Sequence, residues 1–192
     1  LDFFPSFGTS YTINQKNSVN LNYSRRINRP GYQSLNPFES KLDELTYQKG
    51  NPFLRPQYTN SISLTHSYKY TLNTSIGYSK TTDFSTQITD TIEGRRNFIQ
   101  ERNAGTQQNI YINISYPFNV TKWWSVYANL GASHLINDVN LGINRISNIA
   151  ITSWSVYNQH TVTLPQKFTI EVSGFYNSPS IWGGTFRNRP FW

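Results

Sequence analysis

Strict alternation of apolar and polar residues is the feature that most constrains the fold of this chain. Ile110, Ile112 and Ile114, for example, are separated by single Tyr and Asn residues. Successive side chains of a β-strand point to opposite faces of a sheet, so a period of two indicates a strand with two different faces. The same period predicts eight strands, at about 7–13, 19–27, 60–66, 71–82, 104–116, 123–136, 150–164 and 168–176.

The composition excludes several other classes of protein. The 192 residues include four Ala and five Glu, so strong helix formers are scarce and a helical bundle is disfavoured. No Cys is present, which excludes a disulfide scaffold, a Cys-based zinc site and thiol catalysis. Mean hydropathy is −0.56, and no window approaches the roughly 18 apolar residues of a membrane helix. A soluble β-sandwich and a membrane β-barrel remain.

The lengths of the connections separate these two classes. They alternate between short and long along the chain: short at 14–17, 67–70, 117–122 and 165–167, long at 28–57, 83–100 and 137–148. Short turns at one end and long loops at the other are typical of an outer-membrane barrel, whereas a Greek-key sandwich does not separate loops by length. We therefore expect an all-β, antiparallel up-and-down meander of about eight strands. Residues 1–192 would form one segment of a transmembrane outer-membrane β-barrel, with a long extracellular loop at about 28–57.

The chemistry of the two strand faces supports the barrel. The non-apolar face is mostly Asn, Ser, Thr, Gly and Tyr and is nearly free of charge, apart from Glu171. Aromatic residues gather near the short turns, where rings of an interfacial girdle would lie at headgroup depth. The predicted membrane-interface aromatics are Tyr68, Tyr70, Tyr116, Phe118, Trp123, Trp124 and Phe168. In the sandwich alternative, the same rings would fill a soluble core.

Both ends of the chain suggest a segment of a longer protein. The sequence contains no Met, and Leu1-Asp2-Phe3-Phe4-Pro5 lacks the charged start and apolar stretch of a signal peptide. A mature or trimmed soluble domain is the alternative interpretation.

Two motifs carry a family resemblance. The run from Asn22 to Phe38 reads NYSRRINRPGYQSLNPF, and the run from Gly50 to Gln57 reads GNPFLRPQ. With Trp123-Trp124 after a short turn, they resemble the outer-membrane β-barrel family of TonB-dependent receptor-like proteins from Bacteroidota. The resemblance implies the C-terminal half of a barrel of about 22 strands. It also implies a plug and an N-terminal domain, neither of which is present in this sequence, and energisation through TonB.

The loop that holds these motifs contains the candidate ligand-binding residues. Its four prolines, Pro30, Pro37, Pro52 and Pro56, fix backbone φ and stiffen the segment. Arginines where the second strand ends can pair with carboxylates or with lipopolysaccharide phosphates. The candidate ligand contacts at the loop and rim are Arg25, Arg29, Tyr32, Asn36, Phe38, Asn51 and Arg55. In the alternative interpretation, the motif only braces the rim or the lumen.

No pattern supports catalysis, a metal or a cofactor. His66, His134 and His160 lie far apart without metal-ligand spacing, and no nucleophile or phosphate-binding motif occurs. Arginines lie in or near the long connections, which suits a lipopolysaccharide-facing rim better than nucleic-acid binding.

These features together predict a non-enzymatic protein of the Gram-negative outer membrane. The first hypothesis is a TonB-dependent receptor-like transporter that takes up an unidentified ligand. Its expected partners are outer-membrane lipid and lipopolysaccharide, with TonB and a plug domain implied by the resemblance alone. A porin-like or structural barrel without energised transport and a soluble β-sandwich binding module are the alternatives.

Overall fold

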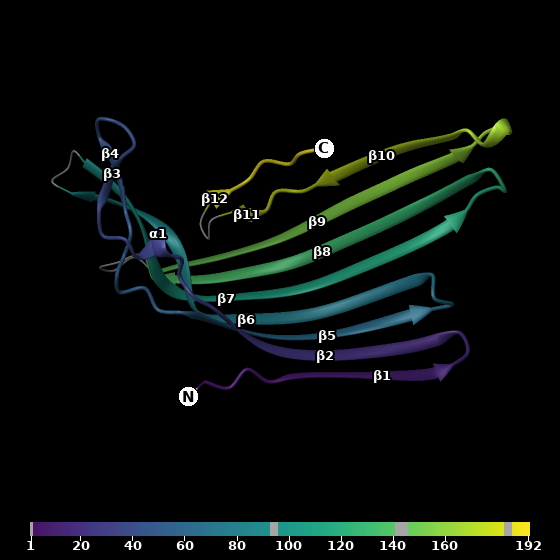
Figure 1. Cartoon of the computed structure of the whole chain (residues 1–192), viewed down its shortest axis with the longest axis horizontal. Coiled ribbons are helices and arrows are strands. Elements are labelled where there is room, and N and C mark those ends of the chain that lie inside the picture. Colours follow the sequence, from purple (N-terminus) through teal and green to yellow (C-terminus); the bar gives the residue numbers. More distant parts are fainter. Residues whose placement is uncertain (1, 93–95, 141–145, 183–185) are drawn as a thin grey trace.

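One large antiparallel sheet dominates the structure, a computed structural model that describes residues 2–92, 96–140, 146–182 and 186–192 (Figure 1). Its main strands are β1 (Ser6–Asn14), β2 (Asn17–Asn28), β5 (Gln57–Tyr68), β6 (Leu72–Ile92), β7 (Arg96–Asn119), β8 (Trp124–Asn140), β9 (Ile146–Thr163) and β10 (Thr169–Asn177). The smaller elements are α1 (Tyr32–Leu35), β3 (Glu39–Lys41), β4 (Thr46–Lys49), η1 (Pro165–Lys167), β11 (Ile181–Trp182) and β12 (Phe186–Arg187). The eight main strands pair in chain order, so the predicted meander is confirmed.

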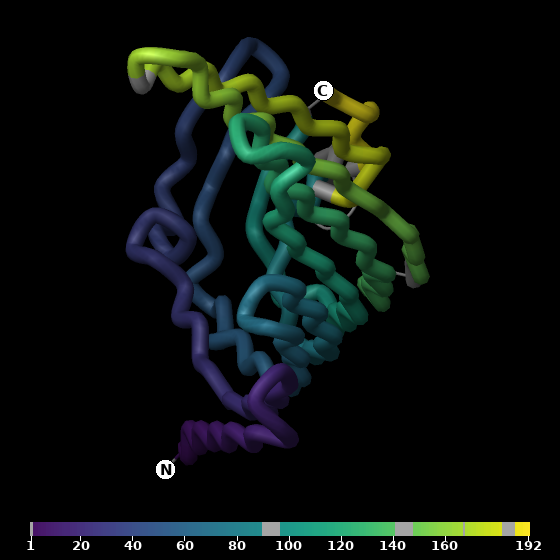
Figure 2. The backbone as a smooth tube through the Cα atoms, turned by 90° about the vertical axis from the view of Figure 1, so that its right-hand side faces the viewer, coloured from purple at the N-terminus to yellow at the C-terminus, as the bar shows by residue number. Residues whose placement is uncertain are grey.

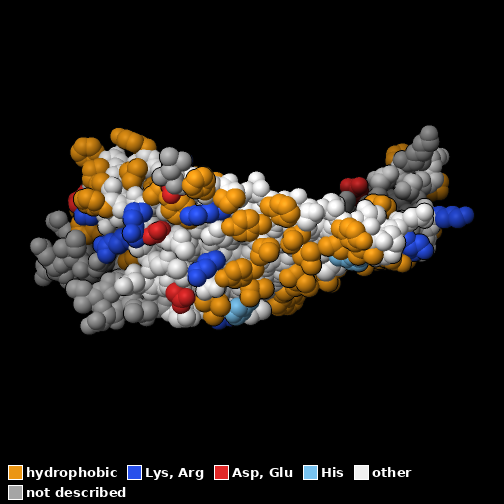
Figure 3. All heavy atoms as spheres, turned by 90° about the horizontal axis from the view of Figure 1, so that it is seen from below, with side chains coloured by type: hydrophobic (Ala, Val, Ile, Leu, Met, Phe, Trp, Pro, Cys, Tyr) orange, Lys and Arg blue, Asp and Glu red, His pale blue; other side chains and the backbone are white. Residues whose placement is uncertain are grey.

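Pairing of the strands turns the alternation of the sequence into two continuous faces. One row of paired residues on the first face is Leu21, Leu64, Ile76, Ile112, Ala132 and Trp154. The neighbouring row on the opposite face is Asn20, Thr65, Ser75, Asn113, Gly131 and Ser155. The apolar side chains are largely exposed, and Figure 3 shows them as a band along the sheet. The sheet therefore has one apolar and one uncharged polar face, each uninterrupted across six strands.

The sheet is curved and open at both edges. It bends from β1 round to β10, and the segment between β2 and β5 lies across the open side (Figure 2). The polar row is half-buried whereas most of the apolar row is exposed, so the polar face lies on the concave side. Among the described residues, no ladder joins β1 to β10, as predicted for this chain. A soluble sandwich requires two facing sheets around a core, and this single curved sheet excludes that alternative.

Two of the predicted long connections are wrong. The connection expected at 83–100 is mostly strand, because β6 continues to Ile92 and β7 begins at Arg96. Likewise, most of the connection expected at 137–148 belongs to β8 and β9, which extend to Asn140 and from Ile146. The physical reason is that strand pairing needs only backbone hydrogen bonds, whereas the alternation needs one apolar face. These extensions carry polar residues on both faces with only scattered apolar ones, such as Ile88, Phe98 and Val139, so the period of two disappears while the ladder continues.

The third long connection, predicted at 28–57, is confirmed as the segment 29–56 and contains α1, β3 and β4. We call it the rim loop. The small buried core lies at this end of the sheet. Its described hydrophobic members are Leu54, Ile88, Phe98, Ala104, Val126 and Val139, of which all but Val126 belong to the rim loop or to strand residues near it. Packing is therefore concentrated where the rim loop meets the long strand extensions.

Candidate functional site

The rim loop leaves the sheet after β2 and pairs again with β7, which lies three strands further across the sheet. Its β3–β4 hairpin pairs through β4, in parallel, with the first residues of β7: Thr46 with Asn97, Tyr47 with Phe98 and Gln48 with Ile99. β7 offers a free edge there because its ladder with β8 ends at Gly105. Figure 1 shows α1, β3 and β4 gathered at the end of the sheet opposite the short turns. Backbone pairing to β7 thus fixes the loop over the polar end of the sheet.

Two Asn-Pro-Phe turns of the same design shape the base of the rim loop. The Asn36 side chain accepts the backbone N–H of Phe38 at 3.2 Å, and the Asn51 side chain accepts that of Phe53 at 3.0 Å. The turns are joined because the Gly50 N–H donates to the carbonyl of Asn36 at 2.8 Å. Each turn leaves its Phe ring outside the packing, with exposed fractions of 79% for Phe38 and 88% for Phe53. The repeated motif therefore builds a fixed pair of turns that presents two apolar rings.

Asn103 of β7 clamps the end of the rim loop to the sheet. Its side-chain oxygen accepts the N–H of Arg55 at 2.7 Å, and its side-chain nitrogen donates to the carbonyls of Arg55 at 2.9 Å and Asp83 at 2.7 Å. The guanidinium of Arg55 also pairs with the Asp83 carboxylate at 2.6 Å. The sequence did not single out Asn103, because an Asn inside a polar run carries no local signal of a long-range contact.

The predicted ligand residues fall into three groups rather than one cluster. Asn36, Asn51 and Arg55 are engaged in bonds within the rim loop or to the sheet, which is the bracing role of the alternative interpretation. The Tyr32 side chain is 77% exposed, and Phe38 is similarly free of packing. Arg25 lies in β2, and Arg29 directly follows that strand. Ligand contact by these seven residues stays a prediction.

A polar cavity of about 240 Å³ lies between the rim loop and the extensions of β6 and β7. Its lining includes Gln48 and Lys49 of β4, with Gln87 and Glu101 from the facing strands. The Lys49 ammonium lies 3.7 Å from the Glu39 carboxylate and 4.7 Å from the ring centroid of Phe98. Amide groups with one carboxylate and one ammonium can hydrogen-bond a polar ligand. The sequence did not predict this cavity, since its walls come from segments far apart in the chain.

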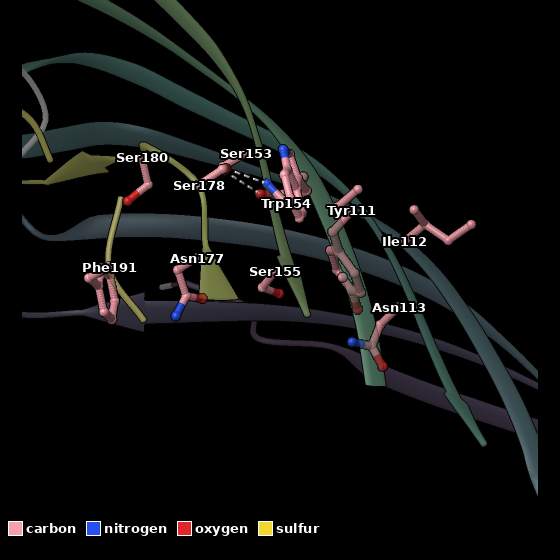
Figure 4. Close-up of a pocket in the computed structure, with 13 residues that line it drawn as sticks. Tyr111, Ile112, Asn113, Ser153, Trp154, Ser155, Asn177, Ser178, Ser180 and Phe191 are labelled. Atoms are coloured by element: carbon pink, nitrogen blue, oxygen red, sulfur yellow. Dashed lines mark hydrogen bonds between the residues drawn. The ribbon is translucent and has the colours of Figure 1, made fainter. Parts of the chain in front are cut away.

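The concave face carries paired uncharged side chains. Asn113 and Asn129 exchange two hydrogen bonds of 3.1 and 3.0 Å across β7 and β8. On the same face a second cavity of about 340 Å³ lies beneath the segment that follows β10, with Tyr111 and Phe191 in its lining (Figure 4). The roof is fixed because Ser178 Oγ accepts the Trp154 N–H at 2.7 Å. This face suits water and neutral polar solutes, because nearly all of its hydrogen-bonding groups are uncharged.

Several of the predicted interface aromatics pack in pairs at the short-turn end. Tyr116 stacks on Phe118 with centroids 5.4 Å apart, and Trp123 stacks on Trp124 at 6.3 Å. Trp124 also donates its indole N–H to His160 at 3.1 Å. Tyr68 and Tyr70 lie at the turn between β5 and β6, and Phe168 lies just before β10. Their position at the membrane interface remains a prediction.

In the described parts of the chain, no group of three or more His, Asp or Glu side chains could hold a metal ion. No helix within the described ranges is long and apolar enough to cross a membrane.

The fold and its faces define the class of protein. A curved antiparallel meander with an apolar convex face and a nearly uncharged polar concave face is the wall of a transmembrane β-barrel. Comparison with known families agrees, because the Outer membrane protein beta-barrel family matches residues 1–192. The chain therefore belongs to this family and to the bacterial outer membrane. A search of curated proteins found no match.

Proposed function

We propose that the chain forms part of the wall and of the extracellular surface of a TonB-dependent receptor-like transporter of the Bacteroidota type. This transporter takes up a ligand across the outer membrane. The observation that carries this proposal is the pre-ordered rim loop. Its turns, its β4–β7 pairing and its Asn103 clamp hold it over the open side of the sheet. A loop that is ordered before binding loses less conformational entropy when a ligand arrives.

Ligand capture in this proposal uses the exposed rings of Tyr32 and Phe38 and the amide-lined cavity beneath the loop. Capture by the rim loop would precede displacement of a plug that is driven by TonB. The plug and TonB are supported by the family resemblance of the Asn22–Phe38 and Gly50–Gln57 motifs. The role requires no catalysis.

A non-energised, porin-like barrel is the second candidate. The observation in its favour is the uncharged concave wall, exemplified by the Asn113–Asn129 pair, because a neutral wall also suits passive diffusion of small solutes. The two candidates differ in whether the lumen is closed at rest.

Conductance of the full-length protein in planar lipid bilayers tests the proposal. A plugged transporter gives no steady conductance, and deletion of the segment upstream of the barrel opens it. Purified C-terminal domain of TonB should also bind the full-length protein. Steady conductance of the intact protein together with no TonB binding would refute energised transport and favour the porin-like alternative.

A further inference from the structure

The apolar face of the sheet changes its chemistry toward the rim loop, one row of paired residues at a time. The row Leu21, Leu64, Ile76, Ile112 is wholly apolar, and the next is Tyr23, Ile62, Tyr78, Ile110. The row after that is Arg25, Asn60, Lys80 and Gln108, which we call the donor row. In Figure 3, Lys and Arg side chains gather beyond the apolar band toward this end. Basic residues thus begin where the apolar band ends, on the same face.

The side-chain oxygens of the two amides in the donor row accept hydrogen bonds from tyrosines of the preceding row. Tyr23 donates its hydroxyl to the side-chain oxygen of Asn60 at 3.0 Å, and Tyr78 donates to that of Gln108 at 2.8 Å. An amide whose oxygen is already bonded still has its NH₂ group to donate. With the guanidinium of Arg25 and the ammonium of Lys80, the four neighbouring positions therefore present hydrogen-bond donors.

Arg25 is held in place on this face but is not fully bonded. Its guanidinium carbon lies 5.4 Å from the ring centroid of Tyr58, a cation–π distance. Its Nε atom is buried and has no hydrogen-bond partner among the described residues. Because Nε is buried, an acceptor from a ligand would have to bind the terminal nitrogens of the guanidinium.

We propose that the donor row binds the phosphate groups of lipid A in the outer leaflet of the membrane. Long loops of outer-membrane barrels are extracellular, so the donor row lies at the level of the outer-leaflet headgroups. Strands are about 4.8 Å apart, which separates Arg25 from Lys80 by roughly 10 Å of backbone. Both side chains are long enough to reach a common phosphate, whose oxygens would accept charge-assisted hydrogen bonds. The acyl chains of the same lipid then lie against the apolar rows below.

Two carboxylates on this side of the sheet limit the extent of the site. Asp2 accepts the hydroxyl of Tyr58 at 3.0 Å and so lies close to Arg25. Asp138 accepts a 2.6 Å hydrogen bond from Asn148 and lies on β8, beyond Gln108. The site is therefore centred between Arg25 and Lys80, and Asp2→Asn should strengthen binding by removing an opposing charge.

Binding of diphosphoryl lipid A to the full-length protein in detergent tests the proposal. Arg25→Gln and Lys80→Gln should each weaken binding about tenfold, the value for one lost charge-assisted hydrogen bond. Arg25→Lys should retain more affinity than Arg25→Gln because it keeps the charge. Arg26→Gln is the matched control, since the adjacent side chain lies on the opposite face and its loss should leave affinity unchanged. A heat-modifiable shift in gel mobility confirms that each variant is folded.

Binding measurements with three other compounds identify the ligand. Dephosphorylated lipid A should bind weakly and without difference among the variants, and phosphatidylglycerol should bind less tightly than diphosphoryl lipid A. Inorganic phosphate at the same concentration should not displace the lipid. The proposal is overturned if folded Arg25→Gln and Lys80→Gln bind lipid A like the wild type, or if Arg26→Gln loses as much. Displacement by inorganic phosphate would also overturn it, because the site would then bind a free anion.

Discussion

Replacement of Asn103 by Ala should release the end of the rim loop while leaving the sheet intact. The substitution removes three hydrogen bonds of 2.7 to 2.9 Å that join β7 to the backbone of Arg55 and Asp83. A typical bond contributes about 0.5–1.5 kcal/mol, and the exposed bonds lie at the low end of that range, so the three bonds of the clamp are worth about 1.5–3 kcal/mol. Local opening of the loop should therefore become roughly tenfold to a hundredfold more frequent.

Hydrogen exchange of the full-length protein in detergent measures this opening. The Arg55 amide, which donates to Asn103, should exchange roughly tenfold to a hundredfold faster in the variant. Asn129→Ala is the control, because it removes the reciprocal bonds to Asn113 in the body of the sheet and should not change exchange in the loop. Unchanged exchange at Arg55 in Asn103→Ala would show that the loop is held by other contacts and refute the reasoning.

Three further predictions concern the loop and the two faces. Gly50→Ala should loosen the paired turns, because a Cβ would lie 2.7 Å from the Asn36 backbone nitrogen and clash with its carbonyl; faster proteolysis of the rim loop, with normal barrel mobility on gels, checks this. The Asp43 carboxylate accepts hydrogen bonds from two backbone N–H groups, which lower its pKa in the folded protein. These bonds stabilise the turn fully at a pH above the pKa of an unfolded Asp, about 3.9. The stabilisation is lost as the pH falls through the lower pKa of the folded state. Pepsin cleavage of this turn should rise as the pH falls below the folded pKa of Asp43, and Asp43→Asn should remove this pH dependence. Ile112→Lys, on the apolar face, should cost about 2–4 kcal/mol of folding free energy in lipid, whereas Asn113→Lys on the concave face should be tolerated; urea unfolding in vesicles compares them, and equal losses would contradict the assignment of faces.

The strands were predictable where the membrane imposes a pattern. Ile110, Ile112 and Ile114 alternate because one side of β7 is apolar throughout the band, and the predicted strand matches that part of β7. Beyond the band, residues such as Thr86 and Arg102 still pair in a regular ladder, but neither face is apolar. The same backbone structure then leaves no periodic signal, so the extensions of β6 to β9 were expected as loops.

The candidate site was predictable only in part. The two Asn-Pro-Phe motifs marked the rim loop, since Asn before Pro is a local turn former. Gly50 joins the two turns within the rim loop, whereas the clamp by Asn103 and the cavity beside Glu101 join segments about fifty positions apart. No local pattern encodes such contacts, because they depend on which strand edges are free after the sheet has formed.

The sequence by itself determined the fold class, the two faces and the placement of the short turns, because a period of two and turn-forming residues act locally along each strand. Only the tertiary structure decided what the rim loop does. Strand pairing brings β4 to the free edge of β7, and it sets Arg25, Asn60, Lys80 and Gln108 side by side across four strands. These neighbours are set by register between strands, and register depends on the whole ladder rather than on any single segment.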